Sequence, residues 1–133
     1  MKRIFFNEDL FKLLKNIDSH FSNTNIGISV IDKAIPEKDL QQLYSNQWHL
    51  NNKYFLILDD INKNTLQTLL NIIQFEGFFY GICINCKVDT EILEQLNSIA
   101  RDSNLIFILT KDFLTNDQLF LFDAKVVDTL YDL

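Results

Sequence analysis

The two cysteines of the chain, Cys83 and Cys86, are separated by two residues and lie between an apolar run and a predicted helix. A thiol near the N-terminus of a helix is close to free backbone N–H groups, which lower its pKa and make it a stronger nucleophile. The spacing therefore permits thiol–disulfide exchange in which Cys83 and Cys86 are the catalytic residues. The alternative is structural, with Cys83 as a small apolar strand residue and Cys86 as the first residue of a loop.

The order of apolar strand, Cys-x-x-Cys-Lys and helix around residues 83–87 resembles the active-site segment of the thioredoxins. This resemblance covers only a short segment and implies a thiol-disulfide redox protein. Thioredoxin-like proteins also carry a cis-proline opposite the disulfide, whereas the only proline of this chain, Pro36, is far upstream. A thioredoxin-like redox protein is therefore the alternative interpretation rather than the first one.

A second group of polar residues follows two other apolar runs. Asp59 and Asp60 end one run, and Thr110 and Lys111 end another. The acid pair resembles the acidic pocket of response-regulator receivers, where two acids bind Mg²⁺ beside a phosphoacceptor aspartate, but in that family the pair follows the first strand. We expect Asp59, Asp60 and Lys111 as candidates for a ligand pocket. The alternative is a polar loop in which Asp60 helps to cap the next helix.

Several common sites are absent from the sequence. The two histidines, His20 and His49, have no spacing that supports a zinc site with the cysteines. There is no Gly-x-Gly-x-x-Gly, no Gly-rich phosphate loop and no Gly-x-Ser-x-Gly elbow. We therefore expect no metal, no cofactor and a function other than catalysis.

The net charge of −6 comes entirely from the second half of the chain. Residues 1–66 hold eight Lys and Arg against eight Asp and Glu, whereas residues 67–133 hold four against ten. A phosphate backbone requires clustered Lys and Arg, so this distribution disfavours nucleic-acid binding. It favours electrostatic steering toward a basic protein.

Aromatic residues are interleaved with the acids toward the C-terminus, where residues 89–132 hold nine acids and three basic residues. Acids around exposed aromatics suit docking onto a basic protein, for example a nuclease toxin with a positive active site. We expect a small acidic protein that occludes or regulates such a partner, as immunity and antitoxin proteins do. The alternative is that the aromatics are core residues and the acids solvate the outside. The predicted contact residues are Asp112, Asp117, Phe120, Asp123 and Asp128.

A β-α-β pattern between Tyr54 and Cys86 organises the chain, and similar alternation precedes and follows it. The pattern predicts one α/β domain, residues 1–133. We expect a three-layer α/β/α sandwich with a mainly parallel sheet of five strands and a sixth as an open alternative, Rossmann-like or flavodoxin-like. Such sheets bind ligands outside the carboxyl ends of the strands, where the strand order reverses. Helical spacing places Leu66, Leu69, Leu70 and Ile73 on the inner face of the third helix.

Residues 111–133 have no clear period, and we expect a short helix near residues 115–122 followed by a second ordered segment. An edge strand at residues 119–122 is the alternative. No apolar run approaches the roughly 20 residues that span a membrane, and the N-terminus lacks the apolar segment of a signal peptide. We therefore expect a cytoplasmic protein.

Overall fold

The computed structural model describes residues 1–6, 10–45, 50–73, 78–120, 122 and 124–133. Strands and helices alternate along most of the chain. The strands are β1 (Lys2–Phe5), β2 (Asn25–Ser29), β3 (Lys53–Leu58), β4 (Phe79–Ile84), β5 (Ile106–Thr110) and β6 (Lys125–Val127). The helices are α1 (Leu10–His20), α2 (Glu37–Ser45), α3 (Lys63–Ile72) and α4 (Thr90–Asp102), and the 3₁₀ turns are η2 (Lys111–Phe113), η3 (Gln118–Phe120) and η4 (Leu130–Asp132).

The six strands form one parallel sheet in the order β1-β2-β3-β4-β5-β6. The predicted α/β class and parallel sheet are confirmed, and the sixth strand left open by the sequence is present. The alternation of strand and helix is flavodoxin-like, although flavodoxin itself has the order 2-1-3-4-5. Because each strand here lies beside its predecessor, this sheet contains no point at which the strand order reverses.

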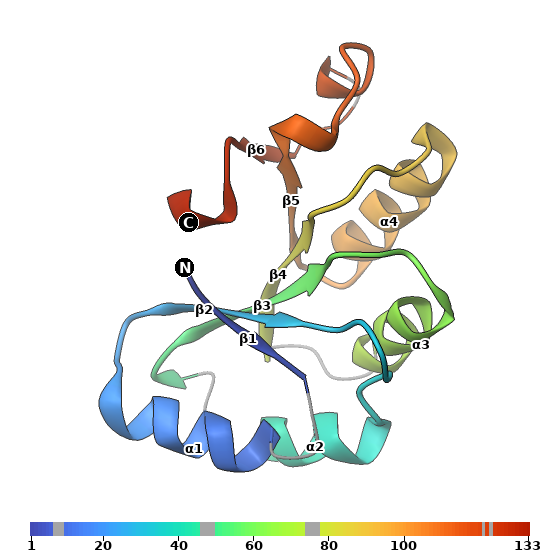
Figure 1. Cartoon of the computed structure of the whole chain (residues 1–133). Helices are drawn as coiled ribbons and strands as arrows, with labels where there is room; N and C mark the ends of the chain where they lie inside the picture. The colour runs from blue at the N-terminus through green and yellow to red at the C-terminus, as the bar shows by residue number, and fades with distance from the viewer. Residues whose placement is uncertain (7–9, 46–49, 74–77, 121, 123) are drawn as a thin grey trace.

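The sequential order decides where the helices lie. Parallel β-α-β connections are almost always right-handed, so strands added in one direction place their connecting helices on one face. Side chains from all four helices meet one set of strand side chains in a single core cluster, and Figure 1 shows α1 to α4 on the same side of the sheet. The sequence pattern predicted helices on both faces. Among the described residues, the second face carries no α-helix. The prediction was wrong on this point because helical periodicity does not specify the strand order.

The second face of the sheet has a smaller apolar cluster of its own. Phe55, Ile57, Cys83, Ile108 and Val127 are buried there, although no α-helix among the described residues packs on them. The partly buried apolar residues that pack against them in the described part of the chain are Met1, Leu130 and Leu133, and the nitrogen of Met1 donates a hydrogen bond to the carbonyl oxygen of Leu133 at 3.0 Å. Figure 1 shows the two ends of the chain side by side on this face. Residues at the two ends of the chain therefore cover apolar side chains that a second layer of helices would cover in a three-layer fold.

Helix α3 is rotated relative to the prediction. Asn62 caps it, accepting hydrogen bonds from two backbone N–H groups of the first turn. The buried face carries Thr65, Thr68, Leu69 and Ile72, whereas the predicted inner residues Leu66, Leu70 and Ile73 are exposed. Thr68 faces inward because its hydroxyl accepts a hydrogen bond from the Ile35 N–H at 2.9 Å. Hydrophobic spacing alone does not detect such a contact.

The C-terminal region also differs from the expected helix near residues 115–122. A single 3₁₀ turn, Gln118–Phe120, lies there, and the sixth strand is Lys125–Val127 instead of residues 119–122. The buried side chain of Gln118 donates a hydrogen bond to the Val88 carbonyl at 2.9 Å and accepts one from the Thr115 N–H at 3.1 Å. These hydrogen bonds of Gln118 hold the segment against the β4–α4 loop. The spacing of apolar residues in the sequence cannot reveal such a polar contact.

Gly81 offers a test of the close packing on the second sheet face. A Cβ at this position would lie 2.8 Å from the Ile106 carbonyl oxygen and 3.1 Å from the Phe55 ring. We expect Gly81→Ala to lower the free energy of unfolding by about 1–3 kcal/mol, because backbone must move to relieve the clash. Urea denaturation measures the loss.

Gly27→Ala is the matched control, on the same face. The three atoms nearest to its Cβ would belong to the side chains of Ile57 and Met1 and none to the backbone, so side-chain movement alone can relieve the clash and the loss should be smaller. Equal losses for the two variants would contradict this account of the sheet.

Candidate functional site

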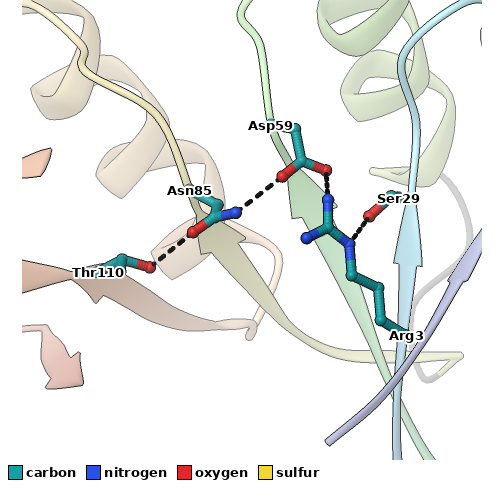
Figure 2. Close-up of polar contacts among 5 residues, drawn as sticks. All are labelled: Arg3, Ser29, Asp59, Asn85 and Thr110. Carbon is teal, nitrogen blue, oxygen red and sulfur yellow. Dashed lines mark hydrogen bonds and ion pairs between the residues drawn. The ribbon is translucent and has the colours of Figure 1, made fainter. Parts of the chain in front are cut away.

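A row of polar side chains crosses the sheet near the carboxyl ends of the strands (Figure 2). Arg3 comes from β1, Ser29 ends β2, Asp59 follows β3, Asn85 follows β4 and Thr110 ends β5. Five adjacent strands each contribute one member because the strand order is sequential. We call these five residues the polar row.

The polar row is continuously hydrogen bonded. The Nε of Arg3 donates to the Ser29 hydroxyl at 2.8 Å, and its Nη2 forms a hydrogen-bonded ion pair with Oδ2 of Asp59. The Asn85 amide donates to Oδ1 of Asp59 at 2.8 Å, and the Thr110 hydroxyl donates to Oδ1 of Asn85 at 3.3 Å. Both carboxylate oxygens of Asp59 therefore have donors, and the charge of Arg3 has a partner.

The structure separates the three predicted pocket residues. Asp59 belongs to the polar row, whereas Asp60 is exposed and accepts a hydrogen bond from the Asn62 amide at 3.2 Å. Lys111 is exposed at the start of η2. The sequence reasoning missed the basic partner of Asp59, Arg3. The only indication in the sequence was that Arg3 is a charged residue inside a short apolar strand. This becomes informative only when β1 is known to lie near β3.

A cavity of about 220 Å³ lies beside the polar row. Arg3, Asn85 and Thr110 form its polar side. The turn after β5 contributes Asp112 and Phe113, and residues 128–131 line the rest together with Met1. Residues from both ends of the chain and from three strand ends therefore meet at one hollow.

The two cysteines belong to different surroundings. Cys83 is buried in the apolar cluster of the second sheet face, whereas Cys86 is half-buried against the core on the helix-covered face. Burial raises the pKa of Cys83 from its ordinary value of 9.0 to about 12. Burial, followed by the charges of Asp60 and Asp59, raises the pKa of Cys86 to about 11.

These pKa shifts run opposite to the expected effect of a helix N-terminus. Helix α4 begins at Thr90, and residues 87–89 separate it from Cys86. A thiol with a raised pKa is protonated at neutral pH and is a weak nucleophile. The raised pKa values of Cys83 and Cys86 therefore disfavour thiol–disulfide exchange at neutral pH.

The predicted contact residues lie mainly on the surface. Asp112, Asp117 and Asp128 are exposed, and Phe120 is 88% exposed. Asp123 lies outside the described residues. Tyr131, which is not one of the predicted contact residues, is 85% exposed. Another late aromatic, Phe122, packs against Phe107 instead, with ring centroids 6.4 Å apart. The late aromatics are therefore divided between surface and core.

Within the ranges that the structure describes, no three His, Cys, Asp or Glu side chains gather where they could hold a metal ion. His49, one of the four residues weighed for zinc, lies outside these ranges. Among the described helices, none combines the length and apolarity that crossing a membrane requires.

Comparison with protein families, with curated proteins and with solved structures gives no match to this chain. Fold and site therefore define only a class: a parallel α/β protein with a polar row at the carboxyl ends of its strands.

Removing the central carboxylate tests the polar row. Asp59→Ala leaves the Arg3 guanidinium and the Asn85 amide without their acceptor, so we expect the free energy of unfolding to fall by about 1–3 kcal/mol. Thermal and urea denaturation measure it. Asp60→Ala is the matched control on the exposed neighbour and should change stability by less than about 0.5 kcal/mol. Similar losses from both variants would argue against a structural role for the row.

The buried thiols predict a loss of stability at alkaline pH. From about pH 9 the unfolded chain loses its thiol protons, while the folded chain keeps those of Cys86 to about pH 11 and of Cys83 to about pH 12. The contribution of the neutral buried thiols to stability is fully present below pH 9 and falls as the pH rises through this window.

Urea denaturation between pH 8 and pH 11 measures the effect, with the double variant Cys83→Ala, Cys86→Ala as control. Its stability should decline less steeply, and the remaining slope includes Tyr54, whose pKa burial raises to about 12. Identical slopes for the variant and the parent protein would show that the thiols titrate alike in both states.

Proposed function

We propose that this protein binds a basic partner protein and occludes or regulates it, in the manner of immunity or antitoxin proteins. The observation that carries the proposal is the exposure of two large aromatics, Phe120 at 88% and Tyr131 at 85%, in an acidic segment. We call residues 111–133 the acidic aromatic segment; Asp123 within it lies outside the described residues.

Exposed aromatics of this size favour an interface. Burying a large apolar side chain stabilises an association by about 1.5–3 kcal/mol relative to leaving it in water. Aromatic residues are also enriched among the side chains that dominate binding energies. Phe120 and Tyr131 are therefore the candidate anchors of the interface.

The charge of the segment favours a basic partner. It contains five acids and two basic residues, and four of the acids are exposed: Asp112, Asp117, Asp128 and Asp132. Opposite charges across an interface raise the association rate and disfavour wrong partners. A nuclease, whose active site must be positive to hold nucleic acid, is the kind of protein that fits this surface.

The second sheet face and the β4–α4 loop support the segment. Leu130 and Leu133 pack on the apolar cluster of that face, so this end of the segment is attached to the sheet. Near its start, Gln118 fixes the segment to the β4–α4 loop. The aromatics therefore stand on an anchored surface, which reduces the conformational entropy lost on binding.

Affinity capture from the native host, with identification by mass spectrometry, provides the candidate partner, and calorimetry with the purified partner tests the interface. We expect Phe120→Ser to weaken the affinity at least tenfold, about 1.4 kcal/mol, because it removes an anchor. Asp117→Lys should slow association and flatten its dependence on salt.

Leu50→Ser is the control, because Leu50 is 68% exposed and lies outside the acidic aromatic segment. It should leave the affinity unchanged. The proposal fails if no basic partner binds the purified protein, or if Phe120→Ser and Asp117→Lys bind it as the parent protein does.

A further inference from the structure

We infer that the cavity beside the polar row receives one arginine side chain of the basic partner. This inference rests on the proposed function and adds a specific contact to it. It comes from the size of the cavity, its balance of charge and the two aromatic rings that line it.

The size of the cavity suits a single side chain. Its volume of about 220 Å³ is below the roughly 300–1,000 Å³ of pockets that hold small-molecule ligands. A hollow of this volume favours a single side chain over a ligand of nucleotide size. A side chain inserted from a protein surface needs only a hollow of this kind, open to the outside.

The charge of the cavity favours a cation. Two positive groups belong to the described residues that line it: the Arg3 guanidinium, which is paired with Asp59, and the Met1 amino group, which donates a hydrogen bond to the Leu133 carbonyl. Asp112 and Asp128 contribute two further carboxylates from separate turns. Neither positive group is paired with Asp112 or Asp128 in the described part of the chain, so these two acids remain for an incoming cation.

The aromatic lining favours arginine over lysine. Phe113 and Tyr131 both line the cavity, and Tyr131 is largely exposed. A guanidinium is planar, stacks on aromatic rings and donates hydrogen bonds to carboxylates in pairs. An ammonium is a strongly hydrated point charge and gains less from this combination of rings and acids.

The polar row prepares the cavity for this occupant. Asn85 is held by Asp59 and Thr110, so its amide is already oriented. The Thr110 hydroxyl donates to Asn85 and keeps its own acceptor capacity. Arg3 stays hydrogen bonded to Ser29 and paired with Asp59, so its charge repels an incoming guanidinium less than an unpaired arginine would.

Titration of the isotope-labelled protein with N-acetyl-arginine methylamide, followed by NMR at low salt, tests the inference. We expect saturable shifts of the amide signals of Thr110, Asp112 and Tyr131. N-acetyl-lysine methylamide should bind at least threefold more weakly, and N-acetyl-norleucine methylamide should not saturate. Equal binding of the lysine and arginine compounds, or no saturation with arginine, overturns the inference.

Variants locate the site. The double variant Asp112→Asn, Asp128→Asn should weaken binding of the arginine compound at least tenfold, whereas Asp117→Asn, an exposed acid that does not line the cavity, should not. The NMR spectrum itself reports whether each variant is folded, and Tyr131→Leu provides an independent variant with the same expected direction. Unchanged binding by both cavity variants overturns the assignment.

The purified partner separates this inference from the proposed function. If Phe120→Ser weakens the complex but the Asp112, Asp128 variant does not, the interface stands and the arginine contact is wrong. If no basic partner exists, the proposed function fails. The inferred contact with a partner's arginine then fails as well, even if the arginine compound binds the cavity. Loss of affinity in both variants supports the two proposals together.

Discussion

No α-helix of the described residues covers the second face of the sheet, and much of the structure depends on how this face is covered instead. Six parallel strands in sequential order place α1 to α4 on one face. Phe55, Ile57 and Ile108 nevertheless point to the other face and are buried there. Exposing three such side chains would cost several kcal/mol, at about 1.5–3 kcal/mol each. Met1, Leu130 and Leu133 supply the cover, and this brings both ends of the chain to the sheet.

The position of the candidate site follows from that cover. The two ends of the chain lie side by side on the second face. Met1 and residues 128–131 line the cavity together with Arg3, Asn85 and Thr110 of the polar row. Doubly wound sheets bind ligands where the strand order reverses, because two neighbouring loops diverge there. This sheet has no such point. The hollow arises instead where the last residues of the chain return over the strand ends.

The polar row shows how a mostly apolar sheet tolerates charge. Asp59 is 15% exposed and Arg3 35% exposed, so neither is fully solvated. A partly buried charge is costly unless it is paired and hydrogen bonded. Here each member of the row has a partner, and the acids with few partners are those on the surface. Paired polar groups beneath and exposed carboxylates above are compatible with the binding surface that we propose.

The sequence by itself determined the class of fold: its alternating apolar and amphipathic runs specify the strands, most helices and the parallel sheet, because each run must bury its own apolar side chains. It also determined the concentration of acids near the C-terminus. It did not determine the strand order, the rotation of α3 or the path of residues 111–133. Those depend on contacts between distant residues, such as Arg3 with Asp59, Ile35 with Thr68 and Gln118 with Val88. Each is a polar contact of a single pair, so it leaves no period in the sequence, and only the tertiary structure brings its two members together.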